Sequence, residues 1–396
     1  MKYITAILLN LAAIPVINAQ IKDTLWYPAT KQPKEIIEYT SLNGDTIRHG
    51  RYHYYLENGT LGQSGCYDHG ELHGTWKIYF PDESLKQLLP YVNGKLHGTM
   101  SSFLPDGTIV QSAEYKDDQL NGRVEIYNSD GSLSETSEYM GGQLHGVARA
   151  YFEDGSLRFK KEYRHGVEHG DITIYYENGN IREISKKKNG RYHGSFRGFY
   201  KEYKDGTIQK VCTYSEGKLD GLLTGYYPSG GIMVETNYEA DTVSGVFFKY
   251  YDSGEKGEKG VLQETGKFRN HKKHGTWRLY YPSGALYTMG DYVKGKFSGE
   301  WMVYFENGSL KQEGNYINGS AEGEFKMYYD TGELKNKGHY EGNLKSGTWI
   351  TYYKNGLIQS EINFVNGQRE GRAIGYDRKG NQVETYYYRN GEIYHH

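Results

Sequence analysis

The chain has 396 residues, of which 52 are Gly and 41 are Tyr, with only 8 Pro, 2 Cys and 5 Trp. Its formal net charge is −2 and its aromatic content is 15%. The near-neutral charge excludes a general electrostatic attraction to nucleic acid, and the aromatic content excludes a disordered chain. Because Tyr carries much of the apolar surface, one large aliphatic core is not expected, although this length normally indicates two or three domains.

The first 19 residues have the pattern of a secretory signal peptide. Lys2 gives a positive start, Ile4–Ile17 is almost entirely apolar, and Ala19 offers a small residue at the cleavage point. No Cys follows the apolar run, so a lipid anchor is not expected. We therefore expect an exported chain, periplasmic, on the cell surface or secreted, without a transmembrane span in its mature part. The alternative is that this segment is a buried first strand of the fold.

An anchor glycine recurs along the chain in the pattern x-G-x-(W/F/Y)-x-x-Y, fourteen times. Eleven of the spacings are 24 residues, one is 27 and one is 30. The anchors are Gly50, Gly74, Gly98, Gly122, Gly146, Gly170, Gly194, Gly221, Gly245, Gly275, Gly299, Gly323, Gly347 and Gly371. A period of 20–50 residues indicates an array of supersecondary units.

Each unit has the pattern of a β-hairpin. An aromatic residue stands five positions after every anchor, and it is Tyr in twelve of the fourteen units; such residues favour strands. An Asn-Gly or Asp-Gly pair follows in many units, as at Asn58-Gly59, and is a strong hairpin signal. The second strand opens with Leu or Ile and carries Tyr six residues later, on the same face. We predict strands at about 51–57 and 60–68, repeating every 24 residues.

The repeats predict an all-β fold: an elongated, single-layer antiparallel β-sheet of about 14 tandem 24-residue β-hairpins. Residues in one column lie about 10 Å apart in successive units, because neighbouring strands are about 4.8 Å apart. The expected organisation is a signal peptide over 1–19, an N-terminal capping segment over 20–49 and the repeat array over 50–394. Insertions near 195–206 and 255–260 are expected in loops on one edge, where either a specific partner binds or neutral drift has lengthened the chain.

Three strings of this pattern carry a family resemblance: Gly74–Phe80, Gly275–Tyr281 and Gly347–Tyr353, each beginning Gly-Thr-Trp. The chain resembles the MORN-repeat superfamily, and specifically its bacterial variant, the YwqK-type antitoxin-like repeats, over about residues 50–394. The resemblance implies antiparallel hairpin arrays that make protein contacts and sometimes lipid contacts, with no catalytic residue to carry over. The antitoxin label implies a toxin partner, whereas the exported start of this chain argues against a cytosolic antitoxin role.

Seven anchors are preceded by His, which raises the hypothesis of a metal or pH-sensing site. They are His49, His73, His97, His145, His169, His193 and His274. Successive units are about 10 Å apart, too far for shared ligation when each ligand lies about 2 Å from the ion. The other units hold Asn, Asp, Ser or Glu here. We interpret the column as turn chemistry and expect no metal site.

No other grouping carries chemistry. Cys66 and Cys212 lie six units apart, beyond disulfide reach, and are expected to be unpaired. Gly254–Gly260 superficially resembles a phosphate-binding loop, but no strand-to-helix switch surrounds it. No Ser/His/Asp spacing signature is present. We therefore expect no enzyme, no catalytic residue and no cofactor.

The leading hypothesis is a non-catalytic, exported repeat scaffold for protein–protein interaction. The regular Tyr columns are interpreted mainly as packing, but part of the aromatic face of a one-layer sheet faces water or a partner. The candidate partner-binding aromatics are Trp76, Trp277, Trp301 and Trp349. The alternative is a carbohydrate-binding or membrane-lipid-binding module that uses the exposed aromatic face; interleaved Lys/Arg and Asp/Glu make an anionic membrane the weaker option. The partner's identity and the oligomeric state stay open.

Overall fold

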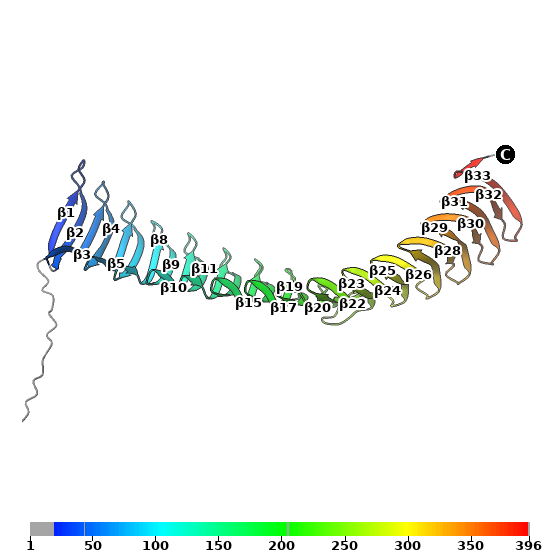
Figure 1. Cartoon of the computed structure of the whole chain (residues 1–396), viewed down its shortest axis with the longest axis horizontal. Coiled ribbons are helices and arrows are strands. Elements are labelled where there is room, and N and C mark those ends of the chain that lie inside the picture. Colours follow the sequence, from blue (N-terminus) through cyan, green and yellow to red (C-terminus); the bar gives the residue numbers. More distant parts are fainter. Residues whose placement is uncertain (1–19, 43, 204–205, 395–396) are drawn as a thin grey trace, which may run out of the picture. The chain divides into compact units, whose positions relative to one another are not determined.

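The structure is a computed structural model that describes residues 20–42, 44–203 and 206–394. These residues form 34 β-strands and no helix. The chain divides into two compact units, Met1–Gly179 (unit 1) and Asn180–His396 (unit 2). The prediction of an all-β fold of antiparallel hairpin repeats is confirmed (Figure 1). The expected signal peptide, residues 1–19, lies outside the described residues.

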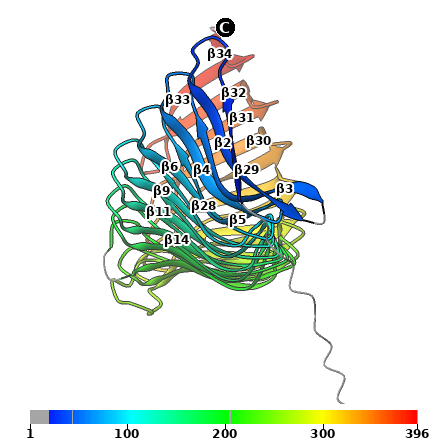
Figure 2. The ribbon, with the colours of Figure 1, turned by 90° about the vertical axis from the view of Figure 1, so that its left-hand side faces the viewer.

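Unit 1 contains the first fifteen strands. They are β1 (Ile21–Trp26), β2 (Pro33–Leu42), β3 (Asp45–Tyr55), β4 (Leu61–Asp68), β5 (Glu71–Tyr79), β6 (Leu85–Val92), β7 (Lys95–Leu96), β8 (Gly98–Phe103), β9 (Ile109–Lys116), β10 (Gln119–Tyr127), β11 (Leu133–Met140), β12 (Gln143–Leu144), β13 (Gly146–Tyr151), β14 (Leu157–Arg164) and β15 (Val167–Tyr175). Figure 2 shows these strands, blue to green, one behind another in chain order and curved along their length.

Unit 2 contains the remaining nineteen. They are β16 (Ile181–Lys188), β17 (Arg191–Phe199), β18 (Ile208–Ser215), β19 (Lys218–Leu219), β20 (Gly221–Tyr226), β21 (Ile232–Glu239), β22 (Thr242–Tyr250), β23 (Leu262–Arg269), β24 (Lys272–Tyr280), β25 (Leu286–Val293), β26 (Lys296–Tyr304), β27 (Leu310–Ile317), β28 (Ser320–Tyr328), β29 (Leu334–Glu341), β30 (Leu344–Tyr352), β31 (Ile358–Val365), β32 (Gln368–Tyr376), β33 (Gln382–Arg389) and β34 (Glu392–Tyr394).

The turn that joins one repeat to the next is a two-residue hairpin. Asn93 and Gly94 both have positive φ, 50° and 75°, and pairing resumes at once with Val92 opposite Lys95. A turn with two positive φ angles matches the twist of the flanking strands. In the repeats that follow such a turn, pairing therefore starts three residues before the anchor glycine, as β5 does at Glu71, and the predicted start one residue after the anchor is wrong.

The turn inside each repeat without an insertion is a three-residue loop. The N–H of Gly59 donates to the carbonyl of Leu56 at 2.9 Å, and the N–H of Leu56 donates to the carbonyl of Thr60 at 2.8 Å. Gly59 has a φ of 89°, and Asn58 accepts a hydrogen bond from the N–H of Thr60 at 3.1 Å. This is a type I turn followed by a left-handed residue. The prediction of hairpin turns from the Asn-Gly and Asp-Gly pairs is confirmed, and in the described pairs of this loop only Gly lies in the left-handed region.

The anchor glycines lie in β-bulges. All fourteen have a φ between 64° and 124°. At Gly74 the pairing with β4 shifts register between Ser64 and Cys66, so that the chain from Gly74 to Trp76 bulges opposite Gly65. A bulge of this kind takes a left-handed residue, which glycine adopts without a steric penalty. The invariance of glycine in this column therefore has a backbone cause.

The N-terminal segment and the longer insertion both form backbone hydrogen bonds with neighbouring strands. Residues 20–49 contain β1, β2 and the start of β3, with Ile21 opposite Tyr39 in an antiparallel pair. The insertion after β22 folds back onto the preceding repeat, where the N–H of Ile232 donates to the carbonyl of Glu258 at 2.8 Å. The Lys259 ammonium also lies 2.7 Å from a carboxylate oxygen of Glu235. The second insertion contains residues 204–205, outside the described residues.

Candidate functional site

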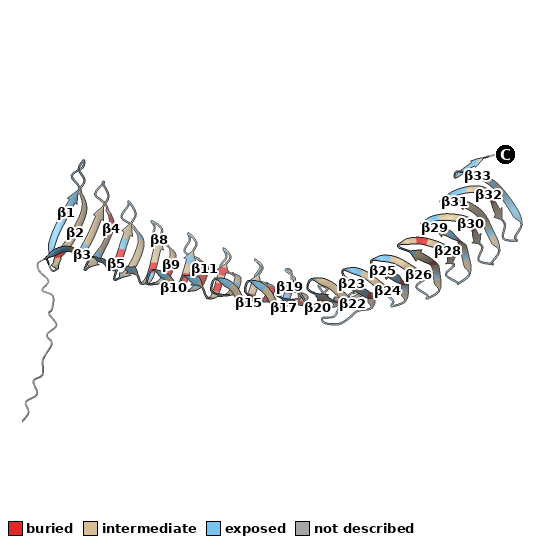
Figure 3. Ribbon diagram, in the orientation of Figure 1, coloured by how far each residue is buried: buried red, intermediate tan, exposed pale blue. Residues whose placement is uncertain are grey.

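Three of the four tryptophans expected on an open binding face are buried in the sheet. Trp277 is 0% exposed, Trp349 6% and Trp76 7%, whereas Trp301 is half-buried. The indole N–H of Trp277 donates to the carbonyl of Lys267 at 3.2 Å, and Trp76 and Trp349 make the same bond at 3.1 Å. These three rings therefore expose little surface to a partner. Figure 3 shows that buried residues, in red, are few along the sheet.

The rings are buried because a glycine lies under each of them. A Cβ on Gly266 would lie 2.3 Å from Trp277, and a Cβ on Gly290 would lie 1.9 Å from Trp301. The same relation joins Gly65 to Trp76, Gly314 to Phe325 and Gly338 to Trp349. An aromatic ring that covers a strand glycine restores the packing that the missing side chain removes. This glycine column, eleven residues before the ring, was missed by the sequence argument, although its spacing is visible in the chain.

Tyrosine hydroxyls tie neighbouring repeats of unit 2 together. In these repeats the tyrosine six residues after the anchor donates to a backbone carbonyl in the next repeat. The acceptor is the last residue of the first strand of that repeat. The bonds run from Tyr200 to Tyr226, Tyr227 to Tyr250, Tyr251 to Tyr280, Tyr281 to Tyr304, Tyr329 to Tyr352 and Tyr353 to Tyr376, at 2.7–3.0 Å. We call these six bonds the hydroxyl ladder. They support the interpretation of the Tyr columns as structural.

The pre-anchor column makes turn contacts. His49 Nδ1 accepts a hydrogen bond from the N–H of His69 at 3.4 Å. In other repeats Asn121 accepts from the N–H of Gly141 at 3.3 Å, and Glu322 accepts from the N–H of Gly342 at 2.9 Å. Imidazole, amide and carboxylate groups thus serve one purpose, which is to hold the next turn. These contacts agree with the interpretation of this column as turn chemistry.

An aliphatic row is exposed on the opposite face of unit 2. Val293 is 47% exposed, Ile317 56%, Leu344 49% and Val365 50%. Val293, Ile317 and Val365 occupy one column of the repeat. The repeat between Ile317 and Val365 has Glu341 in this column, and Leu344 lies directly opposite Glu341. The row therefore crosses four consecutive repeats. We call Val293, Ile317, Leu344 and Val365 the aliphatic row.

A basic pocket lies at the start of this row. It has a volume of about 440 Å³, and its described lining residues are Arg269, Asn270, Lys272, His274, Val293 and Lys294. Three of these carry a permanent positive charge, and none is acidic. The pocket can therefore attract an anionic group.

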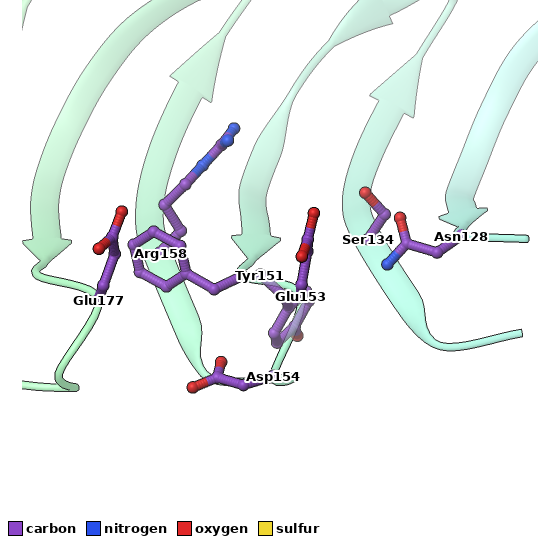
Figure 4. A pocket seen from close by; sticks show the side chains of 8 residues that line it. Asn128, Ser134, Tyr151, Glu153, Asp154, Arg158 and Glu177 are labelled. Atoms are coloured by element: carbon purple, nitrogen blue, oxygen red, sulfur yellow. The ribbon is translucent and has the colours of Figure 1, made fainter. Parts of the chain in front are cut away.

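A larger pocket lies in unit 1, between the loops of successive repeats (Figure 4). It has a volume of about 650 Å³, and its described lining residues are Asn128, Ser134, Tyr151, Phe152, Glu153, Asp154, Arg158 and Glu177. Asp154 accepts hydrogen bonds from the hydroxyl and the N–H of Ser156, at 2.6 and 2.9 Å, and these bonds lower the pKa of its carboxyl. Asp154 thus stabilises its own turn. The described lining holds three carboxylates and one guanidinium, that of Arg158.

The two cysteines differ in environment. Both are free thiols; Cys66 is exposed and Cys212 is buried. Burial raises the pKa of the Cys212 thiol. Each is a strand residue, as the sequence predicts.

Nine segments of the chain match the family model described as "MORN repeat variant". They are residues 72–93, 96–117, 144–165, 168–186, 219–240, 273–294, 297–318, 321–341 and 345–366. These nine segments therefore belong to the MORN-repeat family. Repeats of this family commonly serve interactions with proteins or membranes and are generally non-catalytic. Among the described residues, no helix is long and apolar enough to cross a membrane.

No curated protein matches the chain. Among solved structures, it is similar to a crystal structure of TcdB2-TccC3 at 10% identity, covering 94% of this chain and 23% of that chain with a TM-score of 0.17. A Tc holotoxin pore from Photorhabdus luminescens is 12% identical, covering 92% of this chain and 26% of that chain with a TM-score of 0.16. The chain thus spans about a quarter of these proteins, and TM-scores of this size carry no argument.

Proposed function

We propose that the chain is a non-catalytic, exported scaffold that binds a protein partner along the aliphatic row of unit 2. The observation that carries this proposal is the exposure of four aliphatic side chains in four consecutive repeats. A partner that is a toxin, as the YwqK-type resemblance implies, falls within this proposal.

The aliphatic row stands out because the column beside it is polar in the same four repeats, with Asp291, Asn315, His339 and Asn363. Thr276 and Asp291 lie on this face and share a hydrogen bond at 2.7 Å, as expected for the solvated side of an antiparallel sheet. Exposed apolar side chains in a regular line mark interaction surfaces more often than single ones do. The same column in unit 1 contains Val92, Lys116 and Met140. The residue opposite Lys116 is Gln119, whereas the residue opposite Glu341 in unit 2 is the apolar Leu344.

The basic pocket at Val293 indicates the charge of the partner. Arg269, Lys272 and Lys294 surround it, so a partner that carries an acidic group beside an apolar strip would match both features. Electrostatic complementarity of this kind guides association and fixes the binding register. We therefore propose an acidic, partly apolar protein segment as the ligand.

The carbohydrate alternative depends on exposed aromatic rings. Among the described residues these are Trp26, Tyr203, Tyr287 and Tyr386, and no two of them stand in the same or adjacent repeats. Sugar binding by stacking uses neighbouring rings, and the buried tryptophans do not supply them. The protein scaffold is therefore preferred.

The test compares capture by three versions of the mature chain. The wild type, a row variant and a control are cross-linked in the envelope fraction of the source cells. The row variant is Val293→Ser, Ile317→Ser, Leu344→Ser and Val365→Ser; the control is Val92→Ser, Met140→Ser and Val167→Ser, whose side chains are 43–50% exposed. The wild type and the control should capture one and the same protein. The row variant should capture at least 10-fold less of it. Equal capture by all three overturns the proposal. Sequencing the mature N-terminus tests export.

A further inference from the structure

Two histidines and an aspartate converge near the N-terminal end of unit 1. His49 Nδ1 lies 3.3 Å from Asp68 Oδ1, and His69 Nδ1 lies 2.7 Å from the same oxygen. One ligand atom of each residue lies within 4.8 Å of the other two. Among the described residues, this is the one group of three His, Cys, Asp or Glu side chains that meets this criterion.

Strand register and turn geometry bring the three residues together. Gly50 on β3 lies opposite Tyr67 on β4, which places His49 beside Asp68 at the end of β4. His69 is the first residue of the two-residue turn, with a φ of 49°. Its ring meets that of His49 edge to face at 5.1 Å. Histidines of one column lie about 10 Å apart in successive repeats, whereas this cluster joins a column histidine to a histidine of the following turn.

The arrangement resembles the ligand set of an open metal site. A first-row divalent ion such as Zn²⁺ takes nitrogen and oxygen ligands at about 2.0–2.2 Å, so that tetrahedral neighbours lie about 3.3 Å apart. The separation of His49 and Asp68 already has this value. The three side chains are 24–50% exposed, so an ion can enter and the rings can adjust. Three protein ligands leave one position for water.

The surroundings do not place a competing cation on the carboxylate. Among the described residues, Asp68 forms ion pairs with the two imidazoles and with no Lys or Arg. The nearby Arg48 donates to the hydroxyl of Tyr67 at 3.2 Å and lies over its ring. The Nδ1 lone pair of a neutral His49 imidazole accepts the N–H of His69, so an ion bound at Nδ1 would replace this hydrogen bond.

We propose that His49, Asp68 and His69 form a binding site for a first-row divalent cation, with Zn²⁺ as the expected ion. An ion there cross-links β3 to the turn after β4. The site is independent of the proposed partner-binding function, because it lies in unit 1.

The chain contains a matched control four repeats further along. His145 and His165 stand 96 residues after His49 and His69, and their rings also meet edge to face, at 5.5 Å. Arg164 stands in place of Asp68. This second pair therefore has both imidazoles and lacks the carboxylate. Arg164→Asp should supply the missing ligand.

The experiment measures Co²⁺ and Zn²⁺ binding to the full mature chain without an affinity tag at pH 7.5. The wild type should bind one Co²⁺ with visible absorption bands of a four-coordinate ion, and Zn²⁺ should displace it. His49→Asn keeps the turn hydrogen bond, as Asn121 does in its repeat. His49→Asn and Asp68→Asn, made separately, should each weaken binding at least 10-fold. His145→Asn should leave binding unchanged, and Arg164→Asp should add a second site.

Two results overturn this proposal. One is the absence of bound Co²⁺ in the wild type at millimolar ion. The other is binding by His49→Asn and Asp68→Asn that is as tight as that of the wild type, which would place the ion elsewhere, for example at His395-His396, retained in every variant. Circular dichroism of each variant verifies that its sheet is intact.

Discussion

The hydroxyl of Tyr281 donates a hydrogen bond to the backbone carbonyl of Tyr304, 3.0 Å away and one repeat further along the chain. The hydroxyl ladder repeats this bond from Tyr200 to Tyr376, with one break in unit 2. The break is at Phe305, which occupies the same column but has no hydroxyl to reach Tyr328. In unit 1 the column holds Leu56, Phe80, Leu104, Asn128, Phe152 and Tyr176, so that five of its six members have no tyrosine hydroxyl.

Phe305→Tyr should complete the hydroxyl ladder. A new bond to the carbonyl of Tyr328 should raise the free energy of unfolding by about 0.5–1.5 kcal/mol, the usual net value of one such bond. Tyr281→Phe should lower it by a similar amount because it removes an existing bond. Urea unfolding of both variants checks this. Shifts of the same sign would contradict the role given to the hydroxyl.

Gly290→Ala should destabilise unit 2 by about 1–3 kcal/mol, the usual cost of overpacking. The new Cβ would lie 1.9 Å from Cε3 of Trp301, and φ at Gly290 is not positive, so the cost comes from the ring. In a Trp301→Leu background the same change should cost much less. A double-mutant cycle of unfolding free energies measures this coupling; additive effects would rule out the ring contact as the cause.

Glu83→Gly should stabilise unit 1 by about 1 kcal/mol. Glu83 has a φ of 67° in the loop position that glycine holds at Gly59, and its N–H makes the same bond, to the carbonyl of Phe80 at 2.9 Å. The left-handed conformation costs a residue with a Cβ about 1–2 kcal/mol. Gly59→Glu is the reverse control and should destabilise. Thermal unfolding of the two variants in opposite directions is the expected outcome.

The fold could be predicted from the sequence because one column pattern is repeated fourteen times. The period, the hairpin turns and the alternation of the strands are all local features, and the structure confirms them. The burial of Trp277 could not be predicted in this way, since it depends on Gly266 across the sheet. The cluster of His49 and His69 depends on register in the same way. Pairing across strands, rather than propensity along one strand, decides which side chains meet.

The tyrosine columns predict a loss of stability at alkaline pH. Burial raises the pKa of Tyr52 to about 12, and burial with a hydrogen bond to Glu313 raises that of Tyr328 to about 12. Between pH 10 and 12 the unfolded chain loses these protons and the folded chain keeps them, so the free energy of unfolding falls as pH rises. Below pH 10 this contribution is constant.

Absorbance at 295 nm and circular dichroism follow this titration together. Tyrosine ionisation should lag behind that of free tyrosine and then rise steeply where the sheet signal is lost. Glu313→Gln should move the ionisation of Tyr328 to lower pH, because the carboxylate that accepts its hydroxyl at 2.7 Å is removed. Normal ionisation of every tyrosine near pH 10, with the sheet intact, would contradict the assigned burial.

Tyr304→Ala should cause damage that stays near its own repeat. Tyr304 is half-buried at the end of β26, and β26 pairs with β25 and β27. We expect a cost of about 1–3 kcal/mol, below the value for a fully buried aromatic. Because each repeat contacts mainly its neighbours, the lost stability should not spread along the array. Hydrogen exchange should show faster opening over residues 299–322 and unchanged protection over 50–170. Simultaneous loss of protection in both regions would mean that the two units unfold as one cooperative body.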